Sequence, residues 1–317
     1  MEYLILILSL AGIVLGADFL VKGAVVVARK CKVSSFVIGA VIVGIGTSLP
    51  ELVVSTVGAI GGNSEVAIGN VVGSNIFNVF AILGLTALFF PIAVSRENMK
   101  FEIPFCIAVS ILLMLLVYNF FVVGEPRLGR WDGAALLLVF TAFMWISLRR
   151  GKNSAAAVGE SVEEVNKSLW FAAFSILGGL AALIVSSNFF VDEAVAIARK
   201  LGVSDAFISI TLLACGTSLP ELAASVTAAV KKDTDMALGN IIGSNIFNVT
   251  MILGTASLIT PLTTGKIGLV DYGAMILAAV LPMIFGIRGK ITRIEGLLML
   301  LCYAAYTWYI VTYVMAV

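Results

Sequence analysis

The sequence has no histidine and no paired cysteine motif, and each absence argues against a class of protein. Without His in 317 residues, the chain lacks the usual ligand of transition metals and the side chain best suited to relay protons near neutral pH. Its four cysteines are scattered without a CxxC motif, which argues against a disulfide framework or a structural zinc site. No nucleophile, base and acid occur together, so we expect neither an enzyme nor a bound cofactor.

Charged residues are also scarce. They make up 12% of the chain, with a net charge of +1, whereas soluble domains carry about 25% charged residues. This balance gives no basic surface for a nucleic-acid partner. Hydrophobic residues make up 60%, and the mean hydropathy is +1.09. The composition therefore predicts an all-α, polytopic protein of the lipid bilayer.

Ten apolar runs of about twenty residues, the length that crosses a bilayer as a helix, follow one another along the chain. They cover residues 3–28, 36–60, 66–92, 101–123, 132–149, 168–198, 206–230, 236–261, 268–287 and 294–316. The one long polar stretch, residues 151–167, lies at the centre and is expected to link two halves, 1–150 and 168–317.

The two halves are copies of each other. Residues 18–84 align without a gap to residues 188–254, at an offset of 170 positions, and 32 of the 67 aligned residues are identical. The repeated motifs lie in 36–84 and 206–254. Because each half has five spans, the second copy enters the membrane from the opposite side. This predicts two inverted repeats, an architecture of many secondary transporters.

The basic residues predict the orientation. Alternate loops, including the central one, carry fourteen of the twenty Lys and Arg residues, namely Arg29, Lys30, Lys32, Arg96, Lys100, Arg149, Arg150, Lys152, Lys167, Lys231, Lys232, Arg288, Lys290 and Arg293. The opposite side carries five, and Lys22 lies inside the first span. Because basic loops stay in the cytoplasm, we expect a cytoplasmic central loop and both termini outside.

A hexapeptide, Gly-Thr-Ser-Leu-Pro-Glu, occurs once in each half, at residues 46–51 and 216–221. The proline cannot donate a backbone hydrogen bond, so we expect spans 2 and 7 to break there. The glutamates, Glu51 and Glu221, fall at bilayer depth, where a charge costs roughly 2.5 to 3.5 kcal/mol and usually serves a function. A structural, neutralised carboxylate is the alternative, but no basic residue lies mid-span to pair with either.

A second motif, Gly-Asn-x-x-Gly-Ser-Asn-Ile-Phe-Asn, begins at Gly69 and again at Gly239. Its glycines are expected to let helices approach closely. Ser74, Asn78, Ser244 and Asn248 could either complete an oxygen shell around a hard cation or hydrogen-bond between helices. For Asn70, Asn75, Asn240 and Asn245 we favour the hydrogen-bonding role.

Other charges in the spans are given structural roles. Asp18 and Lys22 are four residues apart on one helix and can pair with each other. Asp192 and Glu193 lie near the outer end of span 6, where a structural or vestibule role is expected.

Together the two motifs, present twice in halves of opposite orientation, resemble the alpha repeats of the calcium/cation antiporter superfamily, and specifically its prokaryotic sodium/calcium exchanger family. The resemblance covers essentially the whole chain. It implies a ten-helix exchanger with broken helices 2 and 7, whose spans 1 and 6 form a separate pair. It also implies a cluster of ion sites between spans 2, 3, 7 and 8.

The ligands implied by the resemblance are Thr47, Ser48, Glu51, Ser74, Asn78, Thr217, Ser218, Glu221, Ser244 and Asn248, with carbonyl groups near Gly44 and Ala214. Some members of the family have Asp at the position of Asn248, so here the site keeps two carboxylates rather than three. Two negative charges are enough to neutralise one calcium ion.

The expected function is sodium/calcium antiport, with calcium and sodium as the transported ions and the chain acting as a monomer. Two alternatives remain open. A proton/calcium antiporter, or one for another cation, would have the same fold, whereas a passive cation channel would belong to a different class.

Overall fold

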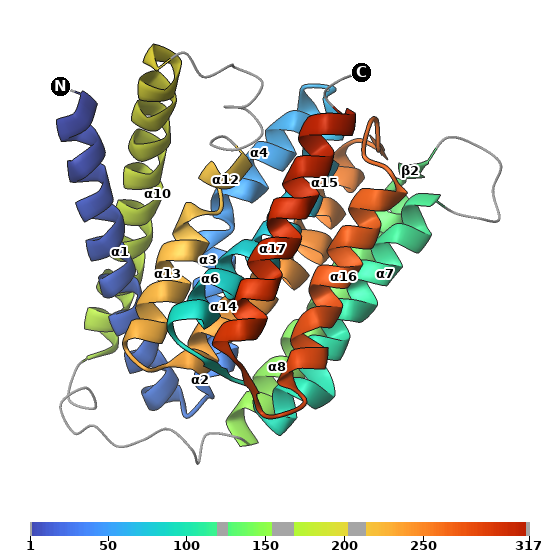
Figure 1. Ribbon diagram of the computed structural model, residues 1–317. Helices are drawn as coiled ribbons and strands as arrows, with labels where there is room; N and C mark the ends of the chain where they lie inside the picture. Colours follow the sequence, from blue (N-terminus) through green and yellow to red (C-terminus); the bar gives the residue numbers. More distant parts are fainter. Residues whose placement is uncertain (1, 119–125, 154–167, 202–213, 315–317) are drawn as a thin grey trace.

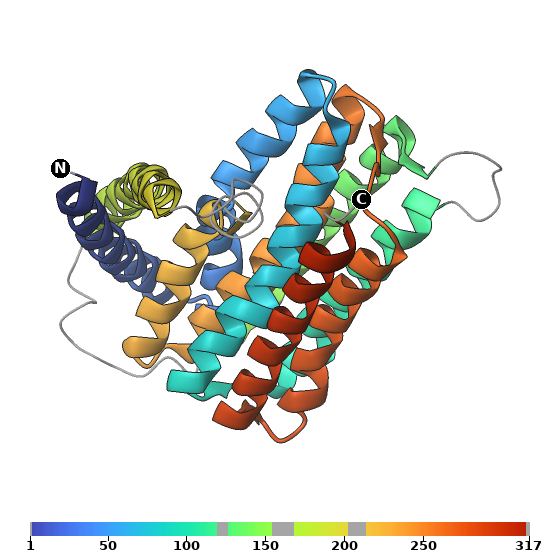
Figure 2. The same cartoon turned by 45° about the horizontal axis from the view of Figure 1, so that its top comes forward.

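The computed structural model describes residues 2–118, 126–153, 168–201 and 214–314, and these are mostly helical. Two long helices, α1 (Glu2–Cys31) and α10 (Leu169–Lys200), run in opposite directions and pack side by side at one edge of the molecule (Figures 1 and 2). Their glycines allow this close approach, since a Cβ atom on Gly179 would lie 2.6 Å from the backbone nitrogen of Leu20. Spans 1 and 6 therefore form a pair, and their separation from the other spans stays a prediction.

Span 2 is broken into several pieces. It consists of α2 (Ser35–Ile38), the π-helical turn η1 (Gly39–Val43), α3 (Gly44–Thr47) and α4 (Leu49–Ile60). The helix bends by 47° between Thr47 and Leu49. In span 7, α12 (Ala214–Gly216) and α13 (Leu219–Val230) are separated at the equivalent place. The first part of that span, residues 206–213, lies outside the described residues.

Spans 3 and 8 form the centre of the molecule and run in opposite directions (Figures 1 and 2). Span 3 contains α5 (Ser64–Phe77), η2 (Asn78–Leu83) and α6 (Gly84–Phe89), and span 8 contains α14 (Thr234–Phe247), η6 (Asn248–Ile252) and α15 (Leu253–Ile259). All residues of α14 from Met236 to Phe247 are buried. Gly239 and Gly243 face α2 and η1, and a Cβ on Gly239 would meet the carbonyl oxygen of Phe36.

The remaining helices lie against this centre. They are η3 (Asn98–Glu102) with α7 (Ile103–Tyr118), α8 (Arg130–Asn153), α16 (Leu269–Gly286), and α17 (Arg293–Tyr309) with η7 (Ile310–Val314). Large apolar side chains such as Leu138 and Trp308, 72% and 71% exposed, point away from the core. These exposed apolar faces suit contact with lipid.

Within the described residues, four two-residue strands add to the predicted all-α fold. Strand β1 (Ile92–Ala93) pairs antiparallel with β4 (Lys290–Ile291), and β2 (Arg127–Leu128) pairs with β3 (Leu262–Thr263). Ile92 lies opposite Ile291, and Leu128 opposite Leu262. Each pair joins a loop of the first half to a loop of the second half.

Within the described ranges, eight helices are long and apolar enough to cross a membrane, or nine with the bent pair of span 2. The protein is thus a polytopic membrane protein, and the span boundaries that fall within the described ranges agree with those predicted to within a few residues. The exact set of ten spans stays a prediction, because span 7 is only partly described. Helix α8 continues to Asn153, so the first residues of the predicted linker 151–167 are helical. Residues 154–167 lie outside the described part.

Candidate cation-binding site

Both hexapeptides fold into the same local structure. Ser48 and Ser218 stand between two helical segments, with backbone angles φ −83°, ψ 10° and φ −93°, ψ 7°. Pro50 and Pro220 follow in the first turn of α4 and α13, where a missing backbone N–H breaks no helical hydrogen bond. The predicted breaks therefore occur just before each proline, and they place Glu51 and Glu221 in the first turn of the new helix.

The two carboxylates are held by serines of the opposite half. Ser48 Oγ donates to Glu221 Oε1 at 2.8 Å, and Ser218 Oγ donates to Glu51 Oε1 at 3.0 Å. Both glutamates have no exposed surface. Among the described residues neither forms a salt bridge, and no third Asp, Glu, Cys or His joins them. Hence the two halves meet at a pair of buried carboxylates that have no basic partner in the part of the chain that the structure describes.

Four amides connect spans 3 and 8, whose helices α5 and α14 pack against α4 and α13. Asn78 Nδ2 donates to Asn245 Oδ1, and Asn248 Nδ2 donates to Asn75 Oδ1, both at 3.1 Å. Asn75 and Asn245 also donate to each other's backbone carbonyl groups, at 3.1 and 3.2 Å. Each of these bonds has a counterpart 170 positions along the chain.

Six buried oxygen atoms of the two repeated motifs have no hydrogen-bond partner among the described residues. They are Glu51 Oε2, Glu221 Oε2, Ser74 Oγ, Asn78 Oδ1, Asn248 Oδ1 and Thr217 Oγ1. Buried polar atoms are nearly always paired, so a group of unpaired ones needs an explanation. Because all of them are oxygens, the group is suited to a hard cation such as calcium or sodium.

The other predicted ligands are engaged within the protein. Thr47 Oγ1 donates to the carbonyl of Val43 at 3.0 Å, and Ser244 Oγ donates to the carbonyl of Gly44 at 3.3 Å. The Gly44 carbonyl also accepts the backbone N–H of Ser48. On the other side, Ala214 begins α12, and its predicted carbonyl role stays a prediction.

Two asparagines brace the broken helices. Asn70 Nδ2 donates to the carbonyl of Glu51 at 3.3 Å and to Ser55 Oγ at 3.0 Å. Asn240 Nδ2 does the same for the carbonyl of Glu221, at 3.2 Å, and for Ser225 Oγ, at 2.8 Å. These interhelical bonds agree with the role favoured from the sequence. They fix the helical turn that carries each carboxylate.

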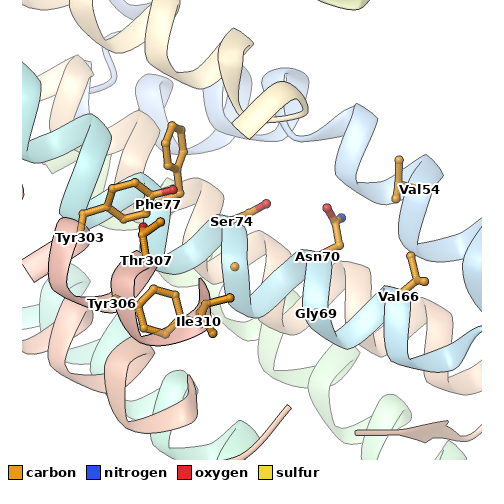
Figure 3. Close-up of a pocket in the computed structure, with 11 residues that line it drawn as sticks. Val54, Val66, Gly69, Asn70, Ser74, Phe77, Tyr303, Tyr306, Thr307 and Ile310 are labelled. Atoms are coloured by element: carbon orange, nitrogen blue, oxygen red, sulfur yellow. The ribbon is translucent and has the colours of Figure 1, made fainter. Parts of the chain in front are cut away.

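A pocket of about 390 Å³ borders the site between α4, α5 and α17 (Figure 3). Gly73 and Ser74 of α5 lie on one side, and Tyr303 and Thr307 of α17 on the other. A Cβ atom on Gly73 would meet nothing within 4 Å among the described residues, unlike one on its counterpart Gly243, which would meet Ala40. Thus the two equivalent glycines have different surroundings.

The predicted pair of Asp18 and Lys22 forms, with 2.6 Å between its charged atoms, but it is part of a larger cluster. Lys231, at the end of α13, also contacts Asp18 at 2.6 Å. The sequence did not indicate this third member, because Asp18 and Lys231 are far apart in the chain.

Asp192 is exposed on α10 and is not part of the site formed by Glu51 and Glu221.

Comparison with known proteins decides the family. The family model described as "Sodium/calcium exchanger protein" matches residues 1–149 and 171–312. The chain belongs to the sodium/calcium exchanger family. It is 37% identical to the putative antiporter CaxA of Alkalimonas amylolytica, over 95% of this chain and 97% of the relative. It is 35% identical to the sodium/calcium exchanger MaX1 of Methanosarcina acetivorans, over 96% and 97%.

A solved structure of the sodium-calcium exchanger NCX_Mj has the same fold. The TM-score is 0.83 at 32% sequence identity, and the alignment covers 98% of each chain. Members of this family are antiporters of the membrane, so the chain is a transporter rather than an enzyme.

Proposed function

We propose that this exchanger moves calcium and sodium in opposite directions across the cell membrane by alternating access, with both ions sharing a site built on Glu51 and Glu221. The observation that carries the proposal is the group of buried oxygen atoms that have no partner among the described residues and that both halves contribute, from the two hexapeptides and from the second motif. The name of the relative MaX1 and the NCX_Mj structure support sodium and calcium as the ions.

The charge of the site supports exchange of these two ions. Two carboxylates are balanced by one calcium ion or by two sodium ions. Without a cation they are like charges in a medium of low dielectric constant, which costs several kcal/mol per buried charge. The empty site therefore resists the change between the outward-open and inward-open states. This resistance couples the movement of one ion to that of the other.

The ligand set of the proposal follows the repeated motifs. It comprises Thr47, Ser48, Glu51, Ser74 and Asn78 from the first half and Thr217, Ser218, Glu221, Ser244 and Asn248 from the second. Because one chain supplies both carboxylates, a monomer is sufficient. The ten spans, the cytoplasmic central loop and the external termini belong to the same proposal.

Ion-dependent flux in reconstituted vesicles tests the proposal. The full-length protein is placed in liposomes, and uptake of radioactive calcium is followed with an outward gradient of sodium, of potassium or of protons, each imposed alone. We expect saturable calcium uptake with the sodium gradient and none with the other two.

Two results would reject sodium coupling or exchange itself. Uptake driven by a pH gradient in sodium-free buffer would identify a proton/calcium antiporter. Calcium flux that needs no counter-ion on the far side and does not saturate would identify a channel.

A further inference from the structure

The orientation of the four central amides follows from a simple constraint. A backbone carbonyl can only accept a hydrogen bond, so the atom of Asn75 that contacts the carbonyl of Asn245 is the nitrogen Nδ2. The oxygen Oδ1 of Asn75 is then on the other side of the amide, and there it accepts from Asn248. The same reasoning applies to Asn245, whose Oδ1 accepts from Asn78.

This constraint passes on to the next pair of amides. Asn75 Oδ1 needs a donor, so Asn248 turns its Nδ2 toward it and its own Oδ1 away from it. That Oδ1 is buried and has no partner among the described residues, and the same is true of Asn78 Oδ1. Both side chains have no exposed surface. In each case the free oxygen belongs to an amide that can no longer rotate without losing a hydrogen bond.

We propose that Asn75 and Asn245 are positioning residues, which turn the amide oxygens of Asn248 and Asn78 toward the bound cation. Each acts on the ligand of the opposite half, so the two halves orient each other's ligands. This inference rests on the proposed function, because it takes the two free oxygens as ligands of the transported ion.

The alternative amide orientation shows what the arrangement prevents. A flipped Asn78 would direct an N–H group at the cation and its oxygen at Asn245 Oδ1, so two repulsive contacts would replace two attractive ones. Asn has no charge, and without Asn245 both orientations of the Asn78 side chain would be accessible. The positioning residues therefore act on ion affinity through the ligand, and the rate of the conformational change does not depend on them directly.

A double-mutant cycle measures this dependence. Half-saturating calcium concentration and maximal rate are determined in liposomes for Asn245→Ala, Asn78→Ala and the double variant. We expect each single substitution to raise the half-saturating concentration about tenfold, as for the loss of one hydrogen-bonded ligand, with a smaller change in maximal rate. The double variant should be no worse than Asn78→Ala alone, because Asn245 acts through Asn78.

A crossed pair provides the matched control. Asn245→Ala combined with Asn248→Ala is expected to show the product of the two single effects, since Asn248 is oriented by Asn75. The mirror cycle of Asn75 with Asn248 repeats the test, and it remains available where one of the first variants fails to fold. If the effects of Asn245→Ala and Asn78→Ala multiply as in the crossed pair, the proposal is wrong.

The same variants are also compared by calcium titration of the detergent-solubilised protein, which requires no transport. If the wild-type chain binds calcium but does not exchange it for sodium, the proposed function fails, while the cycle still decides the role of the asparagines.

Discussion

The two halves of the molecule match closely at the ion site and differ at its edge. At the site, the bond from Ser48 to Glu221 has its counterpart in the bond from Ser218 to Glu51. At the edge, Asp18 of α1 pairs with Lys231, whereas the residues at the equivalent positions are Asn188 and Gly61. The site is shared, so a change in one half alters the ligands of both. The outer helices carry no such constraint and have diverged.

The largest expected effect tests the symmetry of the site. Glu51→Gln and Glu221→Gln each remove one of the two negative charges of the site. The remaining carboxylate then cannot balance the charge of a calcium ion. Breaking a buried charge interaction costs about 3–5 kcal/mol, so both variants should lose sodium-driven calcium uptake by at least about two orders of magnitude. Glu97→Gln, at an exposed carboxylate, is the control. Retained transport in either of the two site variants would show that the halves are unequal.

The crossed serines give the next effect. Ser48→Ala and Ser218→Ala each remove one hydrogen bond to a carboxylate, which is worth about 1.5–3 kcal/mol. We expect both to change the half-saturating ion concentration, by about tenfold or more and in the same direction. Flux titrations of calcium and sodium provide the measurement. Opposite or very different shifts would break the symmetry inferred from the hydrogen bonds.

At the edge of the molecule, two neighbouring glycines of α10 test how closely α10 packs against α1. Gly179 is buried against α1, whereas a Cβ on Gly178 would meet nothing within 4 Å among the described residues. Gly179→Ala should therefore destabilise the protein by about 1–3 kcal/mol through overpacking. Gly178→Ala, the control, should be neutral or stabilising by up to about 1 kcal/mol. Thermal unfolding in detergent measures both, and equal melting temperatures would exclude close packing of α1 on α10.

The smallest expected effect concerns the ion pair between Asp18 and Lys231, which has no counterpart at the equivalent positions of the repeat. Lys231→Gln removes a contact whose side chains are 29% and 30% exposed, so the expected loss of stability is below about 1 kcal/mol. The difference from the wild type should shrink as salt is added, because salt screens partly exposed charges. Lys232→Gln, at the next residue, is the control. A loss that does not change with salt would point to packing rather than charge.

Local patterns predicted much of the fold. Apolar runs predicted the spans that the described residues show, and Pro50 and Pro220 predicted the helix breaks. The repeated glutamates predicted a place where the two halves meet, and each is indeed bonded to a serine of the opposite half. The π-helical turns that begin at Asn78 and Asn248 were not predicted. Such a turn depends on how a helix packs against its neighbours, and no residue type marks it.

Contacts between residues that are far apart in the sequence could not be predicted either. The sequence suggested that Asn75 and Asn245 bind other helices, but it could not say that they face each other across the two halves. Which amide atom points to the ion depends on that contact. The role of the ligands in ion binding stays a prediction from the motifs and from the unpaired oxygens.

The strand pairs have a consequence for how the protein is made. Strand β1 follows the third span, whereas its partner β4 lies about 200 residues further along the chain, so the partner leaves the ribosome long after β1. Many proteins fold domain by domain during translation. Here the first half is inserted into the bilayer before its partners exist. Glu51, Asn75 and Asn78 therefore lack their hydrogen-bond partners until the second half has been inserted.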